Sequence, residues 1–201
     1  REVANKFSGP GEILCQAADM SDRESAIKLF DWSKQQLGQI DILVISAGVN
    51  IVKRSMKEMA PEDWDRVMSI NATGAYNAML CVLPEMRARK DGLIVNISSV
   101  AGVRASSLGG IAYSAAKFAQ TALGNAVARE VGEEGVRITN VYPGEVNTPI
   151  LENRPKPVDD AHKARILQPE DVAHAVMMVA TLPPRAHIAE LVIKPVWQDH
   201  A

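Results

Sequence analysis

Short apolar runs alternate with helix-like segments along the whole chain. The apolar runs are rich in Ile, Leu and Val, and most lack the polar alternation of a half-exposed strand, so both faces of each strand are expected to be buried. Strands that alternate with helices predict a parallel sheet covered on both sides. We therefore predict a doubly wound, Rossmann-like α/β fold with three layers, α/β/α, whose strands lie at 12–17, 40–46, 93–97, 136–141 and 191–194.

Helix start and stop signals fill the spaces between these strands. The segment Ser21-Asp22-Arg23-Glu24 offers a capping box for a helix that ends before Gly38. Further helices are expected at 61–89, 113–132 and 169–180. The segment 149–168 has three prolines among charged residues. It is predicted to be a substrate loop or lid, with a surface excursion that has no function as the alternative.

Composition restricts the class of protein. A chain of 201 residues, 47% hydrophobic and 23% charged, has the size and composition of one globular domain, 1–201. The net charge of -2 gives no electrostatic reason to expect nucleic acid or an anionic membrane as partner. Cys15 and Cys81 lie far apart in the sequence and favour buried free thiols in a reducing compartment over a disulfide. The histidines have no metal-ligand spacing. We expect a cytoplasmic protein without a metal site.

Tyr113 and Lys117 are the most informative pair of residues. Four residues apart on a predicted helix, they share one face. A lysine ammonium there can lower the pKa of a phenol from about 10 and prepare it to exchange a proton with a substrate oxygen. By itself the spacing is common, and the alternative is an aromatic residue with a solvated lysine one turn on. Ligands of such sheets bind outside the carboxyl ends of the strands, which are followed here by Asp19-Met20, Ala47-Gly48, Ser98-Ser99 and Pro143-Gly144.

In this order, the motifs resemble those of the classical branch of the short-chain dehydrogenase/reductase family. The match covers essentially the whole chain and comprises Asp19, Ile45-Ser46-Ala47-Gly48, Asn71 with Gly74, Ser99, Tyr113 with Lys117, and Pro143-Gly144-Glu145-Val146-Asn147-Thr148. The closing segment 169–184 is similar to the subgroup that includes NADP-dependent 3-hydroxy-acid (serine-type) dehydrogenases.

The resemblance implies a catalytic set of Asn71, Ser99, Tyr113 and Lys117. Tyr113 would be the general acid in carbonyl reduction and the general base in alcohol oxidation. Ser99 would polarise the substrate oxygen; Ser98 is the competing candidate, and both serines could instead only cap the end of a strand. Asn71 would distort its helix and hold a water connected to Lys117, or would be a polar residue on an exposed helix face.

The resemblance also implies a nicotinamide cofactor. Subgroup similarity favours NADP, and NAD stays open because the charge that sets this preference follows the second strand of the family, at or before Arg1. Arg1 itself is either a contact to the 2′-phosphate or an ordinary helix charge. Asp19 would accept from the adenine or would only cap the next helix. The implied cofactor-binding residues are Asp19, Met20, Ala47, Gly48, Tyr113, Lys117, Pro143, Gly144, Val146 and Thr148.

One element of the family has no counterpart in this sequence. The glycine-rich turn between the first strand and helix, which cradles the pyrophosphate, is absent, and Ser8-Gly9-Pro10-Gly11 does not replace it. We therefore expect the sequence to be incomplete at its N-terminus and to lack the first βαβ unit. Ser46 replaces an asparagine of the family, which is a milder change because a hydroxyl can still bond nearby backbone.

The expected function is an NAD(P)-dependent oxidoreductase that interconverts a secondary alcohol and a ketone by hydride transfer, with a small 3-hydroxy acid as one candidate substrate. The alternatives are a 3-ketoacyl-thioester reductase and, from another class, a non-catalytic binding or regulatory subunit. Arg104 or Arg154 could pair with a substrate carboxylate, although each is more typical of a surface arginine, and Glu145 would disfavour an anion nearby. We expect a homodimer or homotetramer that pairs helices 64–89 and 113–132.

Overall fold

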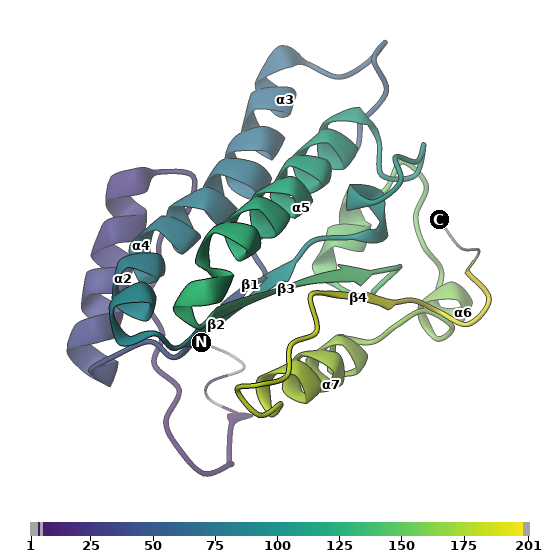
Figure 1. Cartoon of the computed structure of the whole chain (residues 1–201). Helices are drawn as coiled ribbons and strands as arrows, with labels where there is room; N and C mark the ends of the chain where they lie inside the picture. The colour runs from purple at the N-terminus through teal and green to yellow at the C-terminus, as the bar shows by residue number, and fades with distance from the viewer. Residues whose placement is uncertain (1–3, 5, 199–201) are drawn as a thin grey trace.

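The computed structural model describes residue 4 and residues 6–198, so the open question about Arg1 lies outside the described residues. Within them, four parallel strands form one sheet in the order β1-β2-β3-β4. Figure 1 shows helices on both faces of this sheet, which confirms the three-layer prediction. The strands are β1 (Ile42–Ile45), β2 (Gly92–Ile97), β3 (Val136–Pro143) and β4 (Glu190–Ile193).

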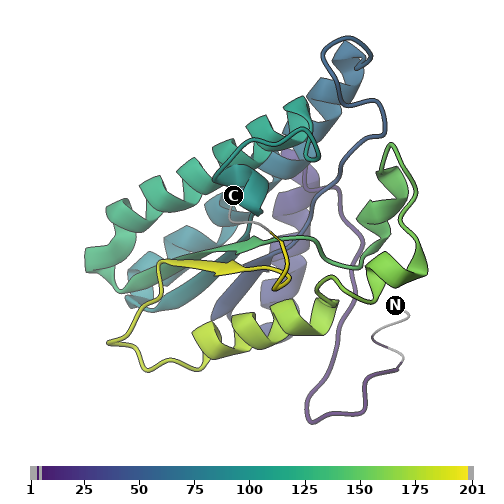
Figure 2. The same ribbon diagram turned by 90° about the vertical axis from the view of Figure 1, so that its right-hand side faces the viewer.

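The helices divide unequally between the two faces. Helices α2, α4 and α5 pack on one face around Phe30 and Met79, while α7 covers the other through Val179 (Figures 1 and 2). The helices are α2 (Arg23–Leu37), α3 (Pro61–Met68), α4 (Gly74–Arg89), α5 (Ile111–Val131), α6 (Asp160–Lys163) and α7 (Pro169–Ala180). Shorter turns are the π-helical η1 (Ser69–Thr73) and the 3-10 turns η2 (Val100–Gly102), η3 (Gly132–Glu134) and η4 (Pro149–Asn153).

The predicted strand at 12–17 is wrong. These residues are exposed and form no strand, and β1 pairs only with β2 among the described residues. Apolar side chains do not make a strand without a neighbouring backbone to complete the hydrogen-bond ladder. Consequently Cys15 is exposed rather than buried, whereas Cys81 is half-buried in α4 and both thiols are free.

The predicted cap of α2 is displaced by one residue. Asp22, not Ser21, is the N-cap, and its carboxylate accepts from the backbone N–H groups of Glu24 and Ser25 at 3.3 and 3.1 Å. The Ser21 hydroxyl is already used, because it donates to Asp19 Oδ1 at 2.7 Å. The helix ends as predicted at Gly38, whose φ of 79° favours glycine.

Candidate active site

A cavity of about 510 Å³ opens at the carboxyl ends of β2 and β3. Its walls come from the segment after β1, the start of α5 and the chain that follows β3. Many residues that the sequence analysis placed at the site line it, namely Gly48, Ser99, Tyr113, Lys117, Pro143, Gly144, Val146 and Thr148. Within the described residues, no group of three or more His, Cys, Asp or Glu side chains is placed to hold a metal, and no helix is long and apolar enough to cross a bilayer.

Asn71 lies in the π-helical turn η1 that separates α3 from α4. The predicted helix distortion is therefore present, and an exposed position for Asn71 is excluded because its side chain is fully buried. Its Oδ1 accepts from the backbone N–H of Val49 at 2.7 Å, and its Nδ2 donates to Val49 O at 2.9 Å. Such π-turns occur frequently at functional sites. Here the paired hydrogen bonds fix the segment after β1 to η1.

The two serines after β2 are used differently. Ser98 is buried, and its hydroxyl contacts the Lys117 carbonyl at 3.2 Å and the Thr121 hydroxyl at 2.9 Å, so it joins the strand end to α5. Ser99 faces the cavity and accepts from the backbone N–H of Ala101 at 3.1 Å. Because that bond uses an oxygen lone pair, the Ser99 hydroxyl proton remains able to donate to a group in the cavity.

Tyr113 lies in the first turn of α5, and its phenol has a perturbed pKa. Burial raises the pKa of Tyr113, while the hydrogen bond with Ser99 and the positive charge of Arg54 lower it. The charge that lowers the Tyr113 pKa is thus that of Arg54 and not, as predicted from the helical spacing, that of Lys117. Lys117 Nζ lies 5.8 Å from the centroid of the Tyr113 ring and points its hydrogen bonds elsewhere, to Ile97 O at 2.9 Å and Gln120 Oε1 at 2.7 Å. Burial lowers the pKa of Lys117 to about 7.

Arg54 is a site residue that the sequence analysis missed. Its guanidinium is buried, lines the cavity and donates to three backbone carbonyls, those of Ile51, Leu108 and Asn153. Among the described residues no carboxylate lies within salt-bridge distance of it. No spacing rule singles out Arg54, because two of its three partners, Leu108 and Asn153, lie 54 and 99 residues further along the chain.

The other residues predicted to bind the cofactor differ in whether they line the cavity. Gly48 lines the cavity, and an added Cβ there would come within 3.3 Å of Asn71 Oδ1 and 3.6 Å of Lys117 Nζ, so the absence of a side chain lets these two groups pack close to the backbone. Outside the cavity lining are Asp19, Met20 and Ala47. The Asp19 carboxylate accepts from the Ser21 backbone N–H at 2.9 Å and from the Ser21 hydroxyl at 2.7 Å, which lowers the Asp19 pKa. It therefore closes the turn before α2 and does not cap the helix, whose N-cap is Asp22.

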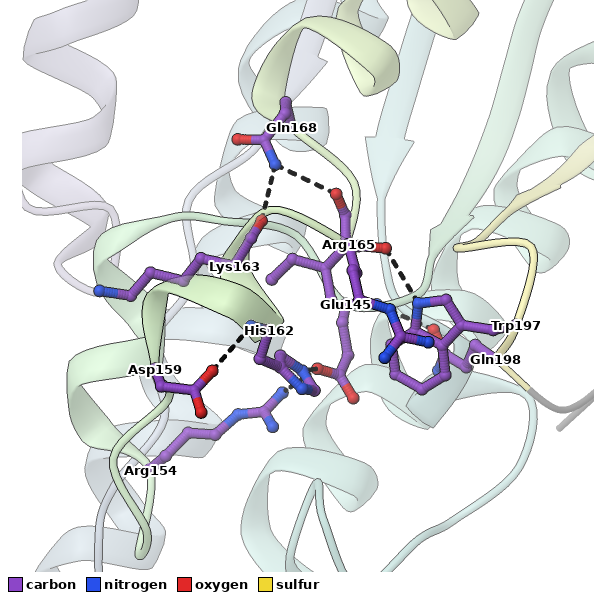
Figure 3. A network of polar contacts seen from close by, with 10 residues as sticks. Glu145, Arg154, Asp159, His162, Lys163, Arg165, Gln168, Trp197 and Gln198 are labelled. Carbon is purple, nitrogen blue, oxygen red and sulfur yellow. Dashed lines mark hydrogen bonds and ion pairs between the residues drawn. The ribbon is translucent and has the colours of Figure 1, made fainter.

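The segment 149–168 is tied to the end of β3 by the side chains drawn in Figure 3. Glu145 Oε2 lies 3.1 Å from an Arg154 guanidinium nitrogen and 2.7 Å from His162 Nε2. The His162 ring packs edge-on against Trp197, with centroids 5.6 Å apart. Glu145 therefore neutralises Arg154, one of the two arginines considered for a substrate carboxylate. The other, Arg104, is exposed and does not line the cavity.

Comparison with known proteins agrees with this geometry. A family model described as short chain dehydrogenase matches residues 1–159. The 3-oxoacyl-[acyl-carrier-protein] reductase of Thermotoga maritima is 30% identical over 177 residues, which cover 86% of this chain and 71% of the relative. The D-beta-hydroxybutyrate dehydrogenase of Rhizobium meliloti is 32% identical, with coverages of 89% and 68%. The closed form of a serine dehydrogenase complexed with NADP+ superposes with a TM-score of 0.86 at 29% identity, over 100% of this chain and 82% of that one.

Proposed function

The chain belongs to the short-chain dehydrogenase/reductase family of CH–OH oxidoreductases, and from that premise we propose that it uses NADP(H) to interconvert a secondary alcohol and a ketone. The observation that carries the proposal is the arrangement of Ser99 and Tyr113 on one cavity, with Lys117 one turn along α5. A non-catalytic role would leave unexplained why these polar groups, with Lys117 buried, gather at one cavity.

In the proposed reaction Tyr113 exchanges a proton with the substrate oxygen. During ketone reduction the phenol donates its proton as negative charge develops on that oxygen, and during alcohol oxidation it accepts the proton back. The Ser99 hydroxyl donates a hydrogen bond to the same oxygen and stabilises the developing charge. The fixed charge of Arg54 favours the phenolate that remains on Tyr113. The nicotinamide, when bound, supplies or accepts the hydride.

The residues of the cavity fit the nicotinamide end of such a cofactor. Gly48, Lys117, Pro143 and Gly144 all line the cavity, so a flat ring bound there would lie against backbone as well as side chains. Val146 and Thr148 complete this wall of the cavity. Asp19, Met20 and Ala47 are proposed to meet the adenosine half, outside the cavity. The choice of NADP is supported by the serine dehydrogenase and by a 28% identical metagenomic short-chain oxidoreductase, both described in complex with it.

The charge of the cavity supports a small acidic substrate, such as a 3-hydroxy acid. Arg54 has neutral partners only, so its positive charge is available to a substrate carboxylate, while Glu145 is already paired with Arg154 and His162. A 3-ketoacyl thioester is the second candidate, since the Thermotoga maritima relative is named for that reaction. Exposed apolar side chains on α4 and α5, namely Leu80 and Phe118, support a homodimer or homotetramer through these helices.

The test is turnover of a substrate panel by the purified protein, followed through the absorbance of reduced nicotinamide. The panel compares L-serine, 3-hydroxyisobutyrate and 3-hydroxybutyrate with an acetoacetyl thioester. Tyr113→Phe should lower kcat by about 10²–10⁴-fold, because it removes the proton donor and acceptor. The matched control Tyr76→Phe removes a phenol from the exposed face of α4 and should leave kcat unchanged. Full activity in Tyr113→Phe would refute the proposed role.

A further inference from the structure

A line of hydrogen-bonded side-chain amides runs between α5 and the sheet, from Lys117 at the cavity to Glu190 on β4. Four carboxamides, which we call the carboxamide chain, connect Lys117 with Glu190 on β4, in the order Gln120, Asn96, Asn140 and Asn125. The donor–acceptor distances along it, starting from Lys117 Nζ, are 2.7, 2.7, 2.7, 2.7 and 3.1 Å. The first three amides are essentially inaccessible to solvent, so their hydrogen bonds replace contacts that water would otherwise make.

The sheet register places these groups in one row. Asn96 on β2 is the register partner of Asn140 on β3, which in turn is the partner of Glu190 on β4. Helix α5 lies across this row and contributes the other members. Gly124 gives the row its space, because a Cβ there would lie 2.2 Å from Asn140 Oδ1. The chain is thus built from adjacent strands and the helix that covers them.

The two ends of the chain fix its direction. A lysine ammonium only donates hydrogen bonds and an ionised carboxylate only accepts them, whereas each carboxamide has one accepting oxygen and a donating NH₂ group. Every amide between them must therefore turn its oxygen toward Lys117 and its NH₂ group toward Glu190. Aligned amides polarise one another, so the bonds of such a line reinforce each other. The Tyr142 hydroxyl also donates to Glu190 Oε1, at 2.6 Å, and holds the carboxylate in place.

Lys117 needs this support because its other neighbours do little to stabilise its positive charge. In the described part of the chain no carboxylate lies within 4 Å of its Nζ. Tyr113 faces it from α5, the Ile97 carbonyl from β2, and the uncharged Asn71 and Gly48 from η1 and the segment after β1. Beyond Tyr113 lies the positive charge of Arg54. Burial alone brings the pKa of Lys117 to about 7, where small changes decide its charge.

We propose that the carboxamide chain is a positioning element for Lys117, which stabilises its ammonium through Glu190 and holds Nζ against the Ile97 carbonyl at the edge of the cavity. Gln120 orients the lysine directly, and Asn96, Asn140 and Asn125 pass on the influence of the carboxylate. The inference rests on the proposed function in one respect, the assignment of Lys117 to the catalytic set. The link between Glu190 and the charge of Lys117 can be measured without any turnover.

The experiment is an NMR titration of the full chain carrying lysine labelled with ¹³C at Cε, with Lys117→Met used to assign the Lys117 signal. Gln120→Leu should lower the titration midpoint of Lys117 by about one pH unit, which is about tenfold in its protonation equilibrium. Glu190→Gln and Asn125→Ala should lower it in the same direction by a smaller amount. Gln120→Glu, which places a carboxylate on Nζ, should raise it. Glu133→Gln, an exposed carboxylate outside the chain, is the control and should leave it unchanged.

Two results would overturn the proposal. The first is an unchanged midpoint in Gln120→Leu or, if that variant does not fold, in both Glu190→Gln and Asn125→Ala, whose substitutions lie at exposed positions. The second is a shift in Glu190→Gln without one in Asn125→Ala, because the carboxylate would then act through space and not along the chain. A protein that gives the expected titrations but turns over no substrate would refute the proposed function alone.

Discussion

Replacing Lys117 with methionine should change how the stability of the protein depends on pH. The buried amine has a pKa of about 7 in the folded protein, compared with an ordinary value of 10.5. Between these values the unfolded chain binds a proton that the folded protein does not, so the free energy of unfolding of the wild type rises with pH in this window. Between pH of about 7.5 and about 9.5 the lysine contributes a rise of about 2.5 kcal/mol.

The assay is urea unfolding of the wild type and Lys117→Met at these two pH values. Other titrating groups are common to both proteins, so their effect cancels in the difference of the two unfolding free energies. That difference should shift by about 2.5 kcal/mol in favour of the wild type as the pH rises. The control Lys28→Met removes an exposed lysine of α2 and should show no such shift. A difference that does not change with pH would show that Lys117 is protonated in the folded protein throughout this range.

Three further substitutions test the packing, the segment 149–168 and the charge of the cavity. Gly102→Ala would place a Cβ 2.5 Å from Ser98 Oγ and should cost about 2–3 kcal/mol in urea unfolding; an unchanged midpoint would contradict this packing. Glu145→Gln removes the carboxylate that holds 149–168, so trypsin should cut there several times faster, and equal rates would argue against the tie. Arg54→Met should raise KM for a hydroxy acid about tenfold or more and spare its methyl ester, with Arg54→Lys intermediate; equal effects on acid and ester would exclude a carboxylate contact.

The sequence predicted correctly those helices and strands whose formation depends on their own residues. The strand predicted at 93–97 is found at Gly92–Ile97, because its apolar side chains are buried on both faces of the sheet. The run at 12–17 has a similar composition and forms no strand, because strand formation depends on a partner that local sequence does not describe. The cap of α2 shifted for a related reason, since two neighbouring side chains, Ser21 and Asp22, competed for the same role.

The site, like the fold, was predictable only where local sequence or the family resemblance identifies the residue. Helical spacing predicted that Tyr113 and Lys117 share one face of a helix, and the family resemblance added Ser99 to the site. All three line the cavity. Arg54 and Gln120 were not predicted as site residues, because their importance comes from contacts with residues that are distant in the sequence. Arg54 reaches residues far along the chain, and Gln120 meets Asn96 from a strand 24 residues away. No local pattern distinguishes such residues from an ordinary surface arginine or a solvated glutamine.

Two of the three cations that line the cavity, Arg54 and Lys117, are held by neutral dipoles, whereas Arg154 pairs with Glu145. Carbonyl oxygens surround the guanidinium of Arg54, and a carbonyl and a carboxamide oxygen hold the ammonium of Lys117. A carboxylate in direct contact would fix a cation equally well but would cancel most of its field. Neutral acceptors orient the charge without cancelling it, which is what the proposed roles toward Tyr113 and a substrate carboxylate require. The cost is a buried charge that is easily lost, which Lys117 shows in its lowered pKa. Placing Glu190 at the far end of the carboxamide chain reduces that cost while keeping the Glu190 carboxylate outside the cavity lining.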